Sequence, residues 1–242
     1  MRWLGALMCA AALVLVAGPW SPASAAESLE TRAKPTVTAR VLRPADALGA
    51  PRAGARHKMR LYGATAWSHG AQRLMVTGRY TDAAGRRWVR VQLPIRPNHS
   101  SGWVRADRVH LSATRVRIEV HTRSRTLEIW HARRRMAVFP AGVGRPGTPT
   151  PAGRFAIEDP FVTLPAWRGV YGRYTLTLTA HSAALRRFMG GNGLVAIHGT
   201  GSGAAWKVGT ASSNGCVVLS DRALAVVARF AKAGTPVLIQ RD

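Results

Sequence analysis

Short stretches in which apolar and polar residues alternate dominate this chain. In its first part, three such stretches follow one another with turn-forming residues between them, at 73–77, 88–93 and 102–104. A period of two places one face of a strand in a core and the other in solvent. Because the strands are short and closely spaced, the pattern predicts a small β-barrel over residues 38–112.

The second part continues as strands, with a single strong helix signal. A hairpin is expected over 115–130, and further strands are expected at 136–139, 154–157, 174–178, 194–197 and 235–240. Ser220 can cap a helix that begins at Asp221 and runs to about Lys232, where Gly234 ends it. A helical turn is expected at 183–189. The pattern therefore predicts a mostly β protein with one or two short helices.

The first 26 residues have the composition of a secretory signal. Arg2 precedes an apolar run over 3–17, and Ala23-Ser24-Ala25 is a small-residue cleavage site. We expect residues 27–37 to form a short linker. Cleavage predicts a protein that is secreted to the cell wall or periplasmic space, with no stable membrane anchor afterwards. A retained anchor is the alternative.

The formal net charge of +24 comes almost entirely from arginine. Such a charge favours contact with a polyanion, of which an anionic cell wall is one. Nucleotide bias toward arginine codons explains the same composition. Because no nucleic-acid-binding motif accompanies the charge, no nucleic-acid partner is expected, and a basic nucleic-acid or membrane-surface binder is the minor alternative.

A glycine-rich stretch over 142–147 matches the pattern G-x-G-x-x-G. A dinucleotide site would need a helix to begin there, so that its N-terminus meets the phosphates. The prolines at 149 and 151 forbid that helix. The stretch is therefore predicted to be a β turn, and no cofactor is expected.

Cys216 is the one cysteine that remains once the signal, with Cys9, is removed. Exported proteins usually pair their cysteines, so a single thiol is either a buried, inert residue or a nucleophile. Ser213, Asn214 and Gly215 form a flexible turn before it. A thiol on such a turn can be exposed beside backbone amides that point the same way, as an oxyanion hole requires.

His198 is the candidate base for this thiol. It follows the apolar run 194–197, so it is expected at the end of a strand. The glycine-rich segment between His198 and Cys216 can loop back and bring the two together. An imidazole there can take the thiol proton and leave a nucleophilic thiolate. Among the other histidines, His181 is the main rival for this role.

These residues resemble the motif of the YkuD-type L,D-transpeptidases, which are cysteine enzymes of the bacterial cell wall. In that motif a histidine precedes [S/T]-H-G-C by 14 to 17 residues, and here fourteen residues separate His198 from Ser213-Asn214-Gly215-Cys216. The resemblance covers residues 114–241. Residues 38–112 resemble bacterial SH3-like domains, in which a W-x-x-V strand precedes a GWV strand. Together the resemblances imply a YkuD-like β-sandwich catalytic domain preceded by an SH3-like barrel.

The resemblance also implies a role for each site residue. Cys216 would be the nucleophile, His198 the general base and then acid, and the carbonyl of Gly199 the group that orients the imidazole. The amides of Gly215 and Cys216 would hold the oxyanion, with Ser213 and Asn214 lining the turn. The substrates would be donor and acceptor stem peptides of peptidoglycan, joined through a 3→3 cross-link with release of D-Ala. Neither a metal nor a cofactor is implied.

Two positions depart from the family motif. Asn214 stands where a second histidine is usual, and Val218 where arginine or asparagine is usual. Asn214 can form hydrogen bonds but cannot titrate near neutral pH. Val218 removes a group that would hold substrate or brace the site. Two alternatives to the transpeptidase therefore stay open: an L,D-carboxypeptidase with water as acceptor, and a non-catalytic wall-binding protein.

Overall fold

The computed structural model describes residues 34–242. The predicted signal and most of the predicted linker lie outside the described residues. Contacts join the described part of the chain into one compact unit. None of its helices is both long enough and apolar enough to cross a membrane.

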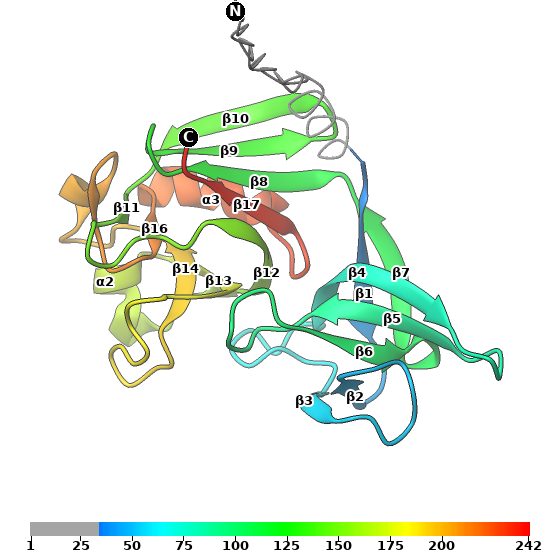
Figure 1. The fold of residues 1–242 in the computed structure, drawn as a ribbon. Coiled ribbons are helices and arrows are strands. Elements are labelled where there is room, and N and C mark those ends of the chain that lie inside the picture. The colour runs from blue at the N-terminus through cyan, green and yellow to red at the C-terminus, as the bar shows by residue number, and fades with distance from the viewer. Residues whose placement is uncertain (1–33) are drawn as a thin grey trace, which may run out of the picture. The chain divides into compact units, whose positions relative to one another are not determined.

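The first half of the described chain forms an antiparallel sheet with the strand order β3-β2-β6-β5-β4-β1-β7 (Figure 1). Alternating residues such as Leu74, Val89 and Val91 line its own hydrophobic core. A 3-10 helix, η1 (Ala106–Arg108), connects β6 to β7, the two strands that come last in sequence. The strands are β1 (Thr36–Val41), β2 (Ala45–Leu48), β3 (His57–Leu61), β4 (Arg73–Thr81), β5 (Arg87–Gln92), β6 (Ser101–Arg105) and β7 (Val109–Thr114).

The second half forms an eight-stranded sheet with the order β10-β9-β8-β17-β12-β13-β14-β16. Most pairs are antiparallel, but β8 with β17 and β14 with β16 are parallel. A small parallel pair, β11 with β15, lies beside it. The strands are β8 (Val116–His121), β9 (Thr126–His131), β10 (Arg134–Pro140), β11 (Val143–Gly144), β12 (Gly153–Val162), β13 (Tyr174–His181), β14 (Leu194–His198), β15 (Ala211–Ser213), β16 (Val217–Val218) and β17 (Pro236–Gln240).

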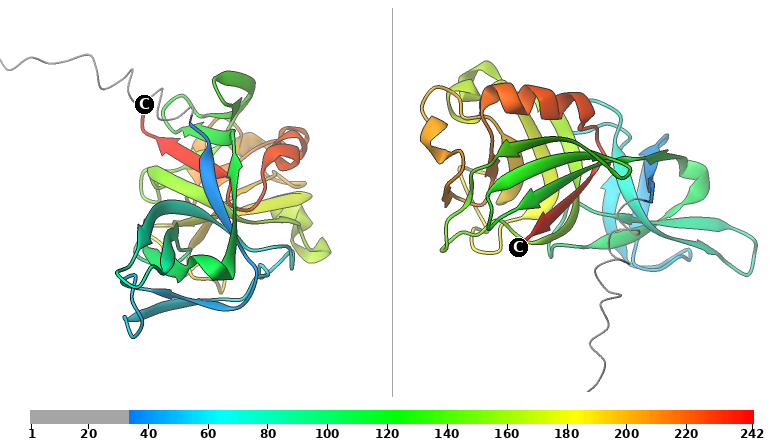
Figure 2. Two further views of the ribbon diagram at one scale, coloured as in Figure 1. Left: turned by 90° about the vertical axis from the view of Figure 1, so that its right-hand side faces the viewer. Right: turned by 90° about the horizontal axis from the view of Figure 1, so that it is seen from above.

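Helix α3 (Asp221–Phe230) covers one face of this sheet (Figure 2). Ser220 caps it as the sequence predicts, because its hydroxyl accepts the amide N–H of Ala223 at 3.2 Å. Leu224 and Val227 are fully buried against the sheet. The remaining helices are short: η2 (Pro165–Trp167), α2 (Arg168–Tyr171) and η3 (Ala205–Lys207).

The mostly β fold with few short helices is confirmed, and two local predictions can be compared directly. The glycine-rich stretch 142–147 contains the predicted turn, closed by a hydrogen bond from Thr148 N to Arg145 O of 2.9 Å. The helical turn at 183–189 is wrong. That segment consists of bends and a short bridge between Phe188 and Gly191, and Arg96 donates to its Leu185 carbonyl. The SH3-like character of residues 38–112 and the domain boundaries remain predictions.

Buried polar contacts join the two sheets. Asn98 bonds the backbone of His181 twice, at 2.8 Å each: its amide nitrogen donates to the carbonyl and its oxygen accepts the N–H. Gln92 donates to Arg154 O at 2.9 Å and accepts from Thr179 Oγ1 at 2.8 Å. Gln92, Thr179 and His181 are almost fully buried and Asn98 is partly buried, so most of these polar groups depend on one another for their hydrogen bonds.

Candidate active site

The ladder between β14 and β16 brings the predicted nucleophile and base together. In this parallel pair Ile197 lies opposite Val217, and His198 lies opposite Val218. Side chains alternate between the faces of a sheet, and Ile197 and Val217 point into the main core. His198 and Cys216, which directly precedes β16, therefore share the other face as diagonal neighbours.

A glycine turn presents the thiol. Gly215 has φ +114°, a backbone conformation that side-chain-bearing residues rarely adopt. The Ser213 hydroxyl closes this turn by donating to Cys216 O at 2.6 Å and accepting from Gly215 N at 3.1 Å. The predicted oxyanion role of the Gly215 amide would therefore require it to leave Ser213. Asn214 lies on the same turn and is partly exposed.

His198 is buried and held in one orientation. Its Nδ1–H donates to the carbonyl of Gly199 at 2.7 Å, which leaves Nε2 as the basic atom. The Tyr171 ring of α2 packs edge-on against the imidazole, with 4.9 Å between centroids. The Tyr171 carbonyl also accepts the N–H of Gly199 at 2.8 Å. Imidazole, orienting carbonyl and covering ring thus form one packed unit.

Gly199 must be a glycine because there is no room for a side chain at this position. A Cβ at this position would lie 1.8 Å from Asp221 Oδ1, and a Cβ at Gly172 would lie 1.9 Å from the same atom. The first turn of α3 therefore presses a carboxylate against the loop behind His198. This close approach fixes the carbonyl that orients the imidazole.

Electrostatics keep the pair neutral at rest. Burial lowers the pKa of His198 to about 4; the hydrogen bond to Gly199 opposes this shift, and the charge of Lys207 adds to it. Burial raises the pKa of the Cys216 thiol, against the effects of the Ala196 backbone and Lys207. A neutral imidazole beside a protonated thiol is the state from which a base removes a proton as the thiol attacks.

Lys207 and Tyr171 belong to this environment, although the sequence analysis did not single them out. The Lys207 ammonium lies 5.5 Å from the Trp206 ring centroid, and its charge influences both His198 and Cys216. A signal for Lys207 was present, because it is one of only four lysines and lies between the histidine and the cysteine. Tyr171 is distant in sequence and carried no signal.

Val218 is fully buried directly opposite His198. Its backbone forms two hydrogen bonds with Gly142, and a Cβ on Gly142 would lie 2.2 Å from the carbonyl oxygen of Lys207. A charged side chain at position 218 would therefore be buried in a packed region. A cation is instead available from Lys207, on the neighbouring 3-10 helix.

His181, the rival base, lies elsewhere. It pairs with Leu194, at the opposite end of β14 from His198. It is buried, and its Nε2 lies 3.2 Å from the amide nitrogen of Asn192. Burial, together with the charge of Arg96, lowers its pKa. His181 thus belongs to the junction between the sheets.

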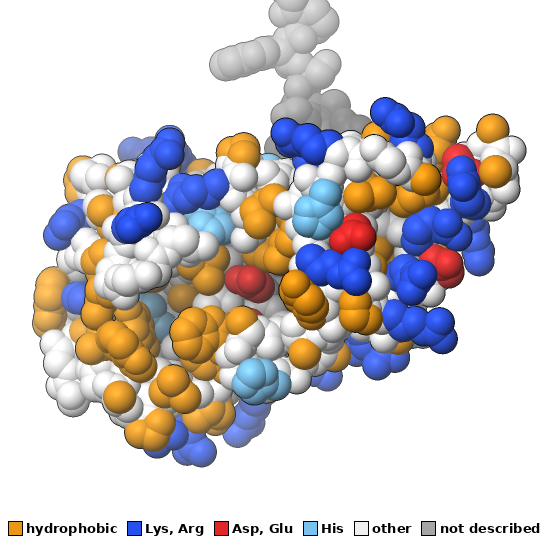
Figure 3. Space-filling model, turned by 90° about the horizontal axis from the view of Figure 1, so that it is seen from below, with side chains coloured by type: hydrophobic (Ala, Val, Ile, Leu, Met, Phe, Trp, Pro, Cys, Tyr) orange, Lys and Arg blue, Asp and Glu red, His pale blue; other side chains and the backbone are white. Residues whose placement is uncertain are grey.

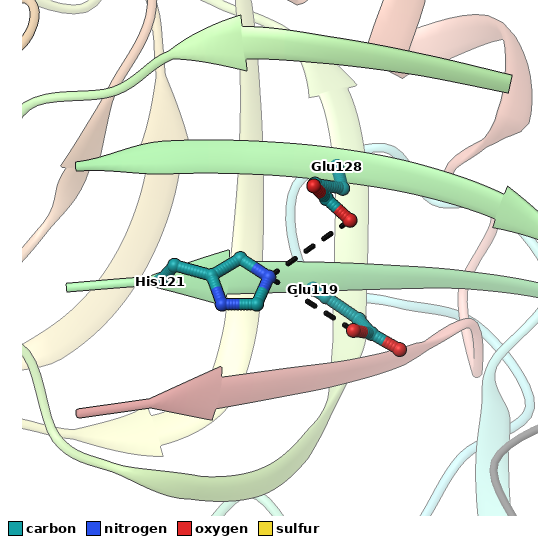
Figure 4. Close-up of side chains that lie close together, drawn as sticks. All are labelled: Glu119, His121 and Glu128. Atoms are coloured by element: carbon teal, nitrogen blue, oxygen red, sulfur yellow. Dashed lines mark ion pairs between the residues drawn. The ribbon is translucent and has the colours of Figure 1, made fainter. Parts of the chain in front are cut away.

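One cluster away from this site has the composition of a metal centre. Glu119, His121 and Glu128 offer atoms within 4.8 Å of one another, and His121 Nε2 lies 3.9 Å from a carboxylate oxygen of each glutamate (Figure 4). Arg117 and Arg135 already pair with the two carboxylates, at 2.6 and 2.9 Å. Their charges balance the glutamates without an ion, so we assign no metal here.

Several large apolar side chains between β12 and η3 are exposed. They are Val162, Leu164, Trp167, Val170, Met189 and Trp206. In Figure 3, apolar side chains gather at the lower left, and arginine and lysine crowd the right.

Comparisons with known proteins identify the family of this chain. The family model of the YkuD L,D-transpeptidase catalytic domain matches residues 115–239. No curated protein matches the chain in sequence.

Solved structures resemble parts of the chain. Bd1075 of Bdellovibrio bacteriovorus is 22% identical with a TM-score of 0.42, over 52% of this chain and 48% of its own. The chain thus spans about half of that protein. L,D-transpeptidase 3 of Mycobacterium tuberculosis is 14% identical with a TM-score of 0.43, and the match covers 64% of this chain and 92% of that protein. Another L,D-transpeptidase of that organism is 15% identical with a TM-score of 0.43, and the match covers 74% of this chain and 94% of that protein.

Proposed function

Because the chain belongs to the YkuD family of L,D-transpeptidases, whose members are cysteine acyltransferases, we propose that it forms 3→3 cross-links between stem peptides of peptidoglycan. The observation that carries this proposal is the β14–β16 ladder, which puts Cys216 and His198 on one face of the sheet. The donor is a tetrapeptide stem, and the acceptor is the side-chain amine of a diamino acid on a second stem.

The first half-reaction is acylation of the cysteine. Cys216 Sγ attacks the carbonyl of the third residue while Nε2 of His198 removes the thiol proton. A tetrahedral oxyanion forms, and in this proposal the Cys216 amide donates a hydrogen bond to it. His198 then gives its proton to the amine of D-Ala, which leaves, and an acyl-thioester remains on Cys216.

The second half-reaction transfers the acyl group. The acceptor amine attacks the thioester carbonyl and loses a proton to His198. The new amide forms, the sulfur leaves, and the proton returns to the thiol. The neutral resting pair suits this cycle, since His198 must accept and release one proton in each half.

We also propose that the protein is exported and works in the cell wall. The sequence pattern of residues 1–26 supports export, and peptidoglycan stems lie outside the cytoplasmic membrane. The high positive charge would favour retention at a wall that carries anionic polymers.

Product analysis tests this function. Residues 27–242 would be incubated with a purified tetrapeptide muropeptide, beside Cys216→Ala, and the products separated by mass. A dimer that lacks one D-Ala, and that disappears with Cys216→Ala, is the expected result. If only the tripeptide monomer forms, the protein is a carboxypeptidase. If no product forms, the wall-binding role is the remaining alternative.

A further inference from the structure

A pocket of about 280 Å³ opens in the first sheet, among residues that the proposed reaction does not use. Its charged lining comes from Arg60 of β3, Arg105 of β6, and Arg108 of η1. Asp46 of β2 is the one acid that lines it. Three guanidinium groups and one carboxylate leave an excess of two positive charges in a small space.

Two of these arginines retain hydrogen-bonding capacity. Nε of Arg105 is buried without a hydrogen-bond partner among the described residues, and the Arg105 Nη2 contact with Asp107 is long, at 3.3 Å. Arg108 is exposed, and residues 34–242 provide its side chain with no hydrogen-bond or ion-pair partner. Arg60, by contrast, is engaged with Asp46 at 2.9 Å. A buried guanidinium N–H without a partner is costly unless a ligand satisfies it.

The rest of the lining is apolar and rigid. Trp88 is 4% exposed, and its indole N–H is taken by Asp82, at 3.2 Å. The Arg105 guanidinium lies 5.6 Å from the centre of the Trp88 ring, which holds its planar group in place. Pro44, Ala45 and Leu48 complete the wall. A ligand must therefore offer an anionic group next to a small apolar one.

We propose that this pocket binds the free carboxylate end of an alanine-terminated peptide. Arg105 and Arg108 hold the carboxylate, and Pro44 and Leu48 contact the adjacent methyl group. Guanidinium groups match carboxylates in a two-point geometry, which favours Arg over Lys here. The pocket's volume suits a chain end, whereas a polymer of repeating phosphates needs an extended cationic strip.

The identification of this peptide as a peptidoglycan stem rests on the proposed function. The argument that the pocket binds a carboxylate rests only on the residues that line it. A pocket for stem ends, separate from Cys216, would hold the enzyme on uncrosslinked wall, where free stem ends are abundant.

Binding of acetyl-Lys-D-Ala-D-Ala tests the pocket, with its C-terminal amide as the matched ligand. The protein would be residues 27–242 with Cys216→Ala, which cannot turn the peptide over, and the readout would be the NMR signal of the Trp88 indole N–H. The carboxylate peptide is expected to shift this signal and the amide is not. Arg108→Gln should weaken binding about tenfold. Arg79→Gln, which removes an equal charge from an exposed site on β4, should not.

Three results would overturn the proposal: equal shifts with the amide, equal effects of Arg108→Gln and Arg79→Gln, or tighter Arg108-dependent binding of poly(glycerol phosphate) than of the peptide. The outcome is independent of catalysis. If unmodified protein converts no tetrapeptide while the peptide still binds through Arg108, the proposed function fails and the pocket stands.

Discussion

At the scale of single residues, the site is set by what surrounds the imidazole. Gly199 supplies the carbonyl that fixes the tautomer of His198, and Tyr171 covers its ring. Lys207 adds a positive charge that disfavours the imidazolium, on top of the effect of burial. The base is therefore kept neutral well below the pH at which a free histidine would protonate.

A pH profile measures this effect. Because the pKa of His198 is lowered to about 4, the acid limb of kcat/KM for a tetrapeptide should lie near pH 4, and not near the 6.5 of an ordinary histidine. Lys207→Gln removes a cation, so the imidazolium becomes easier to form and the limb should move to higher pH. Lys232→Gln, remote in sequence from the site, is the control. An acid limb that stays in place with Lys207→Gln would refute the assigned role of its charge.

At the scale of secondary structure, alternation predicted the strands that carry the site. The runs at 194–197 and 174–178 became β14 and β13, and Ser220 capped α3 as expected. The strands β15 and β16 were missed, because a segment of small residues has no apolar periodicity, and its pairing depends on β11 and β14. The expected helical turn at 183–189 did not form; Arg96, from the loop between β5 and β6, donates to the carbonyl of Leu185 within this segment and to that of Ser182 just before it.

The residues of the candidate site were likewise predicted only in part from the sequence. Spacing and residue type pointed to Cys216, His198 and the turn at 213–215, because the family motif is local in sequence. Tyr171 reaches the histidine, and Asp221 reaches the loop behind it, only through the fold. Both residues contribute through packing contacts, which a sequence motif does not record.

Strand β12 contains a partly buried acid, Glu158, that should make stability depend on pH. Burial, with the nearby charge of Asp159, raises the pKa of Glu158 to about 7 from 4.5. A raised pKa in the folded state means that stability is fully present below pH 4.5 and is lost as pH rises through 7. The shift corresponds to about 3 kcal/mol.

Glu158→Gln should therefore stabilise the protein by up to about 3 kcal/mol at pH 8 and have little effect at pH 4. Urea unfolding at both values would measure it, with Asp107→Asn, at an exposed carboxylate, as the control. An equal effect of Glu158→Gln at the two pH values would contradict the raised pKa.

At the scale of the whole described chain, the two sheets have separate cores but a shared polar junction. Asn98 and Gln92 reach from the first sheet to buried backbone and side-chain groups of the second. Asp159 of the second sheet also contacts the first half of the chain, because its Oδ2 accepts a hydrogen bond from the amide N–H of Trp67 at 2.7 Å. The first sheet is thus part of what holds β12 and β13, the strands next to β14.

Asn98→Ala tests the junction. It leaves the buried N–H and carbonyl of His181 without their partners, which should cost about 2–4 kcal/mol of unfolding free energy. Thr77→Ala, whose hydroxyl makes one exposed contact, should cost well under 1 kcal/mol. Matching urea midpoints for the two variants would show that the junction contributes little.

The most direct test of the account is the mass of the protein itself during reaction. Residues 27–242 would be mixed with tetrapeptide muropeptide, quenched in acid within seconds, and digested to locate any adduct. We predict an added mass equal to the donor minus D-Ala, carried by Cys216 and absent from Cys216→Ala, with slower formation in His198→Gln. An adduct on another residue, or product formation by Cys216→Ala, would contradict the assignment of Cys216 as the nucleophile.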